Sequence, residues 1–157
     1  MKQRTVTIFV GLPGAGKTYG YWLAIGRDTE PIFSPDHVLM RRGHYAWSKK
    51  NVAQAWASSY RFFGKWLWYG SQRCAWDATF VTPISRSAIL GIAKGFGCRV
   101  EAIYFKTPLR TCLARNAKRS LDRQVPEATI REMHRQLVPP TKAEGFDSVK
   151  VVRWLRK

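Results

Sequence analysis

Short apolar runs recur along the chain and alternate with stretches of helical periodicity. The runs are rich in β-branched and aromatic residues and occupy positions 5–10, 31–34, 73–77, 99–105 and 149–154. Runs of this kind predict buried strands. Strands that alternate with helices form a parallel sheet with helices on both faces. The pattern therefore predicts an α/β fold.

Residues 51–69 carry the most regular helical pattern. One face recurs at three- and four-residue spacing and consists of Val52, Trp56, Ser59, Tyr60, Phe63 and Leu67. The periodicity favours a helix that packs into the core over one that offers its aromatic rings as a base-stacking platform.

Three further helices are predicted, and each begins at or near a proline. The first opens at Pro83, and its expected inner stripe is Ile84, Ala88, Ile89, Ile92 and Ala93. The second starts at Pro108, since proline is favoured at the first helical position, and its inner face is Leu109, Cys112, Leu113 and Asn116. The third starts at Pro126 and carries Ile130, Met133 and Leu137.

Residues 11–18 lie between the first strand and a helix that is predicted to end near Gly26. They match the phosphate-loop pattern G-x-x-x-x-G-K-[ST] at every fixed position. The candidate nucleotide-binding residues are Gly11, Pro13, Gly14, Ala15, Gly16, Lys17 and Thr18. The alternative is a glycine-rich turn that binds nothing, but the pattern, its position and its context agree on a phosphate loop. We therefore expect the three-layer fold of P-loop NTPases.

Each fixed residue of this loop has a physical role. Glycines let backbone N–H groups approach phosphate oxygens, and the helix that begins at Lys17 adds the positive end of its dipole. Lys17 can reach the β- and γ-phosphates, and the Thr18 hydroxyl can ligate Mg²⁺. The loop thus predicts a site for ATP, or another nucleoside triphosphate, with Mg²⁺.

Length and composition bound the class of protein. The 157 residues are the size of one compact domain, so a single kinase-sized domain is expected over residues 1–157. No apolar stretch approaches the roughly 18–20 residues that span a bilayer, and the first residues lack a signal-peptide layout. Cys74, Cys98 and Cys112 match no metal or redox pattern. A cytoplasmic protein with free thiols and no membrane contact is expected.

Positive charge dominates the composition. Lys and Arg number 27 against 10 Asp and Glu, a formal net charge of +17. A field of this size attracts polyanions, whereas a merely solubilising surface is usually mixed in sign. Aromatic rings can stack on bases, and four residues of a basic, aromatic segment are the candidate nucleic-acid contacts: Arg41, Arg42, Tyr45 and Trp47. Charge and aromatic content therefore favour a nucleic-acid partner over a small molecule.

Two carboxylates follow predicted strands, where ligands of such sheets bind. Asp36 comes after the second strand and suits a group that accepts the proton of an acceptor hydroxyl; the alternative is a helix N-cap. Asp77 ends the third strand. It could orient an arginine, hold a metal-bound water or serve as the second-motif carboxylate, and the alternative is a strand-end turn or an ion pair.

A basic cluster follows the fourth strand. Arg115, Arg119 and Arg123 recur every four residues, so a helix would present them on one side. The cluster is either a solvated helix end or an Arg-rich lid over the triphosphate. We favour the lid, with Arg119 as the group that stabilises charge on the γ-phosphate and Arg115 and Arg123 as nucleotide contacts.

Together these motifs resemble the kinase domain of phage polynucleotide 5′-kinases, within a broader group of small P-loop kinases. The resemblance covers most of the chain and rests on residues 11–18, on Asp36, on residues 77–79 and on the segment from Arg115 to Met133. It implies that Asp36 is the general base toward the 5′-hydroxyl, that Arg119 contacts the transferring phosphate and that Asp77 helps to arrange the acceptor site.

The chain departs from that family at three points. Leu39 stands where the family has an arginine, for which Arg41 or Arg42 could substitute. The family's Asp-Thr-Asn is Asp77-Ala78-Thr79 here, and no Asp-x-Asp-Gly-Thr phosphatase motif is present. The expected activity is a 5′-hydroxyl polynucleotide kinase for DNA or RNA end repair, without a 3′-phosphatase. The alternatives are a kinase for a nucleoside, nucleotide or other small molecule, and an ATP-dependent nucleic-acid-binding module without transferase activity.

Overall fold

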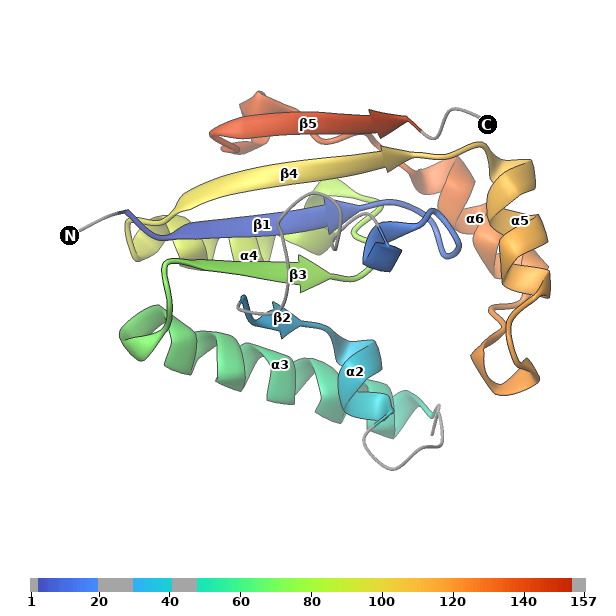
Figure 1. Cartoon of the computed structure of the whole chain (residues 1–157), viewed down its shortest axis with the longest axis horizontal. Helices are drawn as coiled ribbons and strands as arrows, with labels where there is room; N and C mark the ends of the chain where they lie inside the picture. The colour runs from blue at the N-terminus through green and yellow to red at the C-terminus, as the bar shows by residue number, and fades with distance from the viewer. Residues whose placement is uncertain (1–2, 20–29, 41–47, 154–157) are drawn as a thin grey trace.

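The computed structural model describes residues 3–19, 30–40 and 48–153 (Figure 1). The strands are β1 (Thr5–Val10), β2 (Ile32–Phe33), β3 (Arg73–Asp77), β4 (Arg99–Lys106) and β5 (Ser148–Arg153). The helices are α2 (Pro35–Leu39), α3 (Lys49–Tyr69), α4 (Pro83–Gly95), α5 (Leu109–Ala117) and α6 (Glu127–Gln136), with 3-10 turns η1 (Leu121–Arg123) and η2 (Lys142–Glu144). Residues 17–19 begin a further helix after the phosphate loop.

The strands form one parallel sheet in the order β2-β3-β1-β4-β5. Each predicted strand is present, and the sheet is flanked by helices as the alternating pattern predicted (Figure 1). Because β1 lies at the centre, its carboxyl end meets those of β3 and β4, and Phe9 is paired with Asp77. The predicted α/β fold with a parallel sheet is confirmed.

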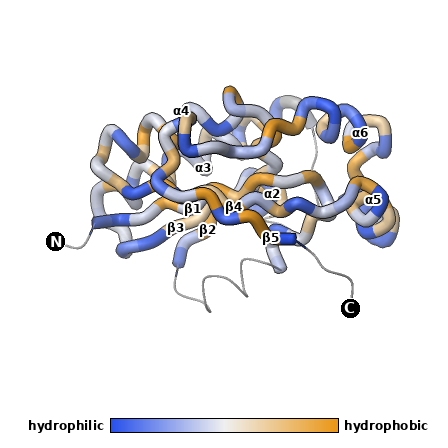
Figure 2. Tube along the Cα trace, turned by 90° about the horizontal axis from the view of Figure 1, so that it is seen from above, coloured by the Kyte–Doolittle hydropathy of each residue, from blue (hydrophilic) through white to orange (hydrophobic). Residues whose placement is uncertain are grey.

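Both faces of the sheet are buried. Successive side chains of a strand point to opposite faces, and the two apolar clusters follow this alternation: Val6, Ile8 and Val10 enter one cluster, whereas Phe9 enters the other. All six residues of β1 are buried. Figure 2 shows hydrophobic positions gathered along β1 and β4. A strand covered on both faces is a near-continuous apolar run, which is why β1 could be recognised.

The apolar face of α3 packs into an aromatic core, as predicted. Trp76 of β3 is fully buried at its centre. Its ring centroid lies 5.2 Å from Tyr60, 5.4 Å from Phe63 and 6.1 Å from Trp56. Ser48 caps the helix by accepting a hydrogen bond from the Asn51 N–H at 3.1 Å. The aromatic residues of α3 therefore contribute mainly to stability, with Trp56 as a partial exception described below.

The predicted inner stripe of α4 is confirmed at Ile89 and Ala93 but wrong at Ile84, Ala88 and Ile92. Its start is confirmed, because Thr82 and Ser85 form a reciprocal capping box around Pro83. The buried positions, however, are Arg86, Ile89, Leu90 and Ala93, whereas Ile84 is 85% exposed. The buried face is shifted from the expected stripe because it includes Arg86 and Leu90, which the prediction left out.

Arg86 is fully buried and joins three segments of the chain. It forms a bidentate ion pair with Glu144, at 2.6 and 2.7 Å. It also donates to the backbone oxygens of Phe80 at 2.9 Å and Val138 at 3.1 Å. Phe80 has a left-handed backbone, with φ of 46°, which is uncommon outside glycine. Arg86 thus holds in place the strained loop that follows Asp77.

Replacing Arg86 by methionine is expected to lower the free energy of unfolding by about 3–5 kcal/mol, because Glu144 and two carbonyl oxygens then lose their partner in a buried setting. Urea denaturation of the purified protein measures the change. Arg131→Met is the matched control, since its ion pair with Glu127 is exposed and such pairs contribute no more than about 0.5 kcal/mol. Equal stability of the two variants would contradict the structural role of Arg86.

Candidate active site

The phosphate loop runs from β1 to the helix that begins at Lys17, and it requires glycine at Gly14. The φ angle of Gly14 is 79°, in the left-handed region, and a Cβ there would lie 2.5 Å from the Cys112 carbonyl oxygen. No side chain fits so close an approach. The loop is therefore packed tightly against α5, and Pro13, Gly14 and Gly16 line the pocket.

Hydrogen bonds from neighbouring elements fix the loop. The Thr107 hydroxyl donates to the Ala15 carbonyl oxygen at 2.8 Å, and Arg115 donates to the Gly14 carbonyl oxygen at 3.4 Å. On the other side, the Gly11 N–H donates to the Thr79 oxygen at 3.0 Å. The loop is held from both the β4–α5 connection and the loop after β3, so its conformation is preorganised.

Lys17 folds back over the loop that precedes it. Its Nζ donates to the carbonyl oxygens of Gly11 and Leu12, both at 3.0 Å. Burial lowers the pKa of Lys17; the nearby charge of Arg119 acts in the same direction, and the charges of Asp77 and Asp36 oppose it. An anion bound against Nζ would favour the charged ammonium, which is the form that a triphosphate site needs.

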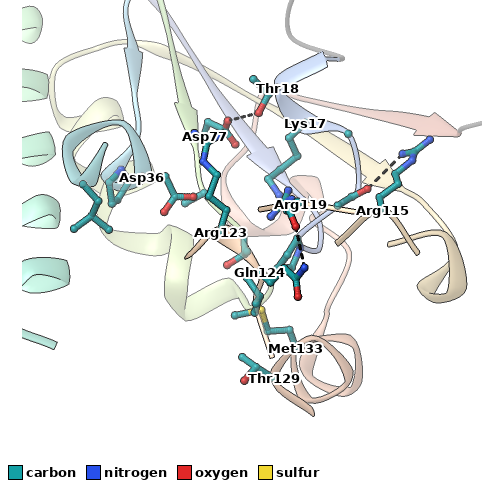
Figure 3. A pocket seen from close by; sticks show the side chains of 18 of the residues that line it. Lys17, Thr18, Asp36, Asp77, Arg115, Arg119, Arg123, Gln124, Thr129 and Met133 are labelled. Carbon is teal, nitrogen blue, oxygen red and sulfur yellow. Dashed lines mark hydrogen bonds between the residues drawn. The ribbon is translucent and has the colours of Figure 1, made fainter. Parts of the chain in front are cut away.

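Thr18 and Asp77 meet across the edge of the sheet. The Thr18 hydroxyl donates to Asp77 Oδ2 at 3.3 Å (Figure 3). Burial raises the pKa of Asp77, and the charge of Asp36 adds to this effect, whereas Lys17, His37 and the Thr18 hydrogen bond oppose it. A hydroxyl and a carboxylate side by side are the hard oxygen ligands that Mg²⁺ prefers when phosphates and waters complete its shell.

The donor set at this edge is compatible with Mg²⁺ rather than with a metal held by protein ligands alone. Within the described ranges, no group of three or more His, Cys, Asp or Glu side chains is placed to hold a metal ion. Magnesium characteristically uses one or two carboxylates together with substrate phosphates. The Thr18 hydroxyl and the Asp77 carboxylate match this mode of coordination.

Asp36 is the second residue of α2 and lies exposed at the pocket. Ser34 occupies the N-cap position, and the Asp36 backbone oxygen accepts from the Met40 N–H at 3.1 Å. The alternative that Asp36 caps the helix is therefore excluded. Its charge influences both Lys17 and Asp77, which places the three ionisable groups in one electrostatic cluster.

The three arginines of the basic cluster line the same pocket, but they do not lie on one helix. Only Arg115 belongs to α5; Arg119 lies in the turn after it, and Arg123 ends η1. The expectation of a continuous helical segment was wrong. Figure 3 shows the arginines around the pocket together with Lys17.

Two amide side chains hold this turn in place. Asn116 pairs with the backbone of Val125 in both directions, donating at 2.8 Å and accepting at 3.0 Å. Gln124 donates to the carbonyl oxygens of Arg119 at 2.8 Å and Ala117 at 3.2 Å. The segment therefore doubles back on α5, which carries Arg119 and Arg123 to the pocket.

The pocket that these residues enclose has a volume of about 950 Å³. This is at the upper end of the roughly 300–1,000 Å³ found for ligand sites, so there is room for more than a triphosphate. The sequence-predicted Pro13, Gly14, Gly16, Lys17, Thr18, Asp36, Asp77, Arg115, Arg119 and Arg123 all line it. Arg41, Arg42, Tyr45 and Trp47 lie outside the described residues.

Sequence reasoning missed several lining residues. Leu39, Val52 and Trp56 form an apolar wall, and Asp122, Gln124 and Thr129 line the side formed by the basic turn and α6. Asp122 lies within the run of arginines, and an isolated acid in a basic segment could have been recognised from the sequence as a candidate site residue. Trp56 belonged to a periodic apolar face, and periodicity alone does not reveal that one member also borders a cavity.

No helix of the described segments is long and apolar enough to cross a membrane. The three cysteines are buried and free.

Comparison with solved structures identifies the fold. A chain of the Pnkp1/Rnl/Hen1 RNA repair complex matches with a TM-score of 0.72 at 17% identity, over 87% of this chain and 45% of that one. A sugar kinase from Janibacter sp. HTCC2649 matches with a TM-score of 0.61 at 14% identity, over 97% and 86% of the two chains. Chaetomium thermophilum Kti12 in complex with ADP-AlF3 matches with a TM-score of 0.68 at 12% identity, over 95% and 89%.

The protein thus spans less than half of the RNA-repair chain that it resembles. Identities this low show the fold alone, an α/β architecture with a parallel sheet flanked by helices. No curated protein matches the sequence. The model of the AAA domain family, by contrast, matches residues 6–140, which is most of the chain, and the protein belongs to this family.

Proposed function

We propose that this protein is an ATP-dependent polynucleotide 5′-hydroxyl kinase, which transfers the γ-phosphate of ATP to the 5′-OH end of DNA or RNA within one domain. The observation that carries the proposal is a single pocket that combines a phosphate loop with Asp36 on the opposite side. An exposed carboxylate facing the triphosphate site supplies what a hydroxyl acceptor needs.

Each residue has a role in the proposed reaction. Lys17 and the loop backbone bind the β- and γ-phosphates, Arg119 stabilises charge on the transferring group, and Arg115 and Arg123 bind the nucleotide. Thr18 and Asp77 would hold Mg²⁺, which would neutralise negative charge on the phosphates. The hydrogen bond between Thr18 and Asp77 supports the role of Asp77 as the second-motif carboxylate.

Asp36 acts on the acceptor. Its carboxylate accepts the proton of the 5′-hydroxyl while the hydroxyl oxygen forms a bond to the γ-phosphorus. The bond between that phosphorus and the β,γ-bridging oxygen breaks, and ADP leaves. The products are a 5′-phosphorylated end and ADP, and the proton remains on Asp36 until it exchanges with solvent.

A polymer acceptor is supported by charge and by likeness. The net charge of +17 favours a polyanion. One structural neighbour is a chain of an RNA repair complex. A second candidate function is a kinase for a small acceptor. Leu39 favours it, because the polynucleotide kinases that the chain resembles have an arginine at this position, and a sugar kinase shares the fold.

Transfer of labelled phosphate from ATP to a panel of acceptors tests the proposal. We expect label in 5′-OH DNA or RNA oligonucleotides and none in the same oligonucleotides with a 5′-phosphate, which serve as the blocked control. Oligonucleotide binding should weaken steeply with salt, because phosphate contacts release counterions. Label found only in a nucleoside or a sugar would establish the second candidate instead. ATP hydrolysis stimulated by DNA without a labelled product would indicate a binding module.

A further inference from the structure

The candidate pocket has two unlike walls. One wall is polar and positive and consists of Lys17, Arg115, Arg119 and Arg123. The opposite wall comes from α2 and α3, which pack against each other, and consists of Leu39, Val52 and Trp56. A triphosphate matches only the first wall. Asp36, the group proposed to act on the acceptor, lies on α2 beside this second wall, so we assign the wall to the acceptor rather than to the nucleotide.

Trp56 is held rigidly at this wall. It is half-buried, and its indole stacks on the buried Trp76 with 6.1 Å between centroids and 16° between planes. Phe80 contacts it edge-on, with centroids 5.9 Å apart. These contacts fix the orientation of the ring while it still borders the pocket. A preorganised aromatic surface binds a flat partner without first losing side-chain entropy.

Leu39 connects this wall to the proposed base. Asp36 and Leu39 are three residues apart on α2, so they lie on neighbouring positions of one helix face, and both line the pocket. Leu39 is 9% exposed, so the surface that it presents to the pocket beside the carboxylate is small and apolar. Among the residues that the structure describes, a phosphate placed there would meet a leucine and the negative charge of Asp36. An uncharged planar group is favoured instead.

We propose that the 5′-terminal nucleobase of the acceptor stacks against Trp56, with Leu39 and Val52 at its edge, so that its 5′-hydroxyl is directed to Asp36. This inference rests on the proposed function and names how that site recognises its acceptor. The acceptor end is selected through its base rather than through the adjacent phosphate. Stacking tolerates every base, because each has a π-face, so little sequence preference is expected at the 5′ end.

Two oligonucleotides with a 5′-OH end, identical except that one has an abasic residue at the 5′ terminus, test the inference on the wild-type protein. Stacking of one base on an aromatic side chain strengthens binding of the nucleic acid. We therefore expect kcat/KM to be about tenfold or more lower for the abasic end. The ratio of kcat/KM for the normal end to that for the abasic end should fall toward one in Trp56→Leu, because the variant phosphorylates only the normal end more slowly. Trp56→Phe should preserve most of it.

Trp68→Leu is the matched control. Trp68 lies on the same helix but is 69% exposed and does not line the pocket, so its replacement should leave the ratio unchanged. ATP binding should be retained in each folded variant, which separates loss of the platform from loss of the fold. If Trp56→Leu does not fold, the comparison of the two ends with the wild-type protein and with Trp56→Phe still tests the stacking role of Trp56.

The two proposals fail in different ways. Equal phosphorylation of the abasic and normal ends by the wild-type protein would overturn the stacking role of Trp56 while leaving the polynucleotide kinase assignment intact. Absence of transfer to every oligonucleotide would overturn both.

Discussion

Replacing Lys17 by alanine is expected to reduce kcat/KM for phosphate transfer by roughly 10³-fold or more, since an aligned charge on the transferring phosphate contributes on this scale. Lys17 lies at the end of the phosphate loop, and its Nζ is within hydrogen-bonding distance of two loop carbonyl oxygens. Those bonds hold the ammonium over the phosphate loop, where we propose that the β- and γ-phosphates bind. No other described lysine lines the pocket, so no nearby ammonium replaces it.

Label transfer under single-turnover conditions measures the effect. Lys65→Ala is a suitable control, because Lys65 is exposed on α3 and lies away from the pocket. The Lys17 variant should also lose affinity for ATP, whereas the control should bind ATP as the wild type does. A Lys17→Ala protein with more than a tenth of wild-type activity would rule out the phosphate-loop assignment.

The half of the pocket that we assign to the phosphate donor could be located from the sequence because its residues are contiguous. Gly14, Lys17 and Thr18 form one short motif, and the apolar run before it could only be a strand covered on both faces. Asp77 was recognised for a related reason: the carboxyl ends of parallel strands share one edge of the sheet. Local sequence therefore contained most of the information for this half.

Contacts between distant residues explain what the sequence did not reveal. Arg86 is buried because its partner Glu144 comes 58 residues later, and no local pattern around α4 indicates that pairing. Ile84 was predicted from its periodicity to face the core, although it is exposed. A buried arginine shifts the apparent stripe, because binary patterning assigns charged side chains to the surface.

The basic cluster is a second case in which local spacing did not predict the structure. Arginines at a spacing of four suggested a helix, but α5 ends at Ala117, where Lys118 and Arg119 make tight backbone hydrogen bonds to residues three positions earlier. Asn116 then captures Val125 nine residues later and turns the chain back. The arginines reach the pocket through a turn fixed by side-chain amides, which helical periodicity does not describe.

The acceptor half depends on packing between α2 and α3. Leu39 and Trp56 are far apart in sequence and become one wall only when the helices meet. Trp56 was assigned to the core from its periodicity, and most of its contacts bear this out. A residue that packs in the core and also borders a cavity shows the periodicity of a core residue. Its contact with the cavity can be recognised only from the three-dimensional structure.

Asp36→Asn is expected to lower kcat by about 10²–10⁴-fold, the usual contribution of a positioned general base, while ATP affinity changes little. The substitution preserves the size of the side chain and removes only its capacity to accept the proton. Asp36 is exposed at the start of α2 and does not cap the helix, so the fold should tolerate the change. Single-turnover transfer to a 5′-OH oligonucleotide, together with a separate ATP-binding titration, measures both quantities.

The matched control is Glu127→Gln, which neutralises an acid paired with Arg131 on α6 and should leave turnover unchanged. The two variants in the catalytic pocket then differ in kind: Lys17→Ala loses both ATP affinity and transfer, whereas Asp36→Asn loses transfer alone. This separation follows from their positions, since Lys17 belongs to the phosphate loop and Asp36 to the acceptor wall. Normal turnover by Asp36→Asn would show that the hydroxyl needs no proton acceptor at this position, and the carboxylate of Asp77 would then be the remaining candidate.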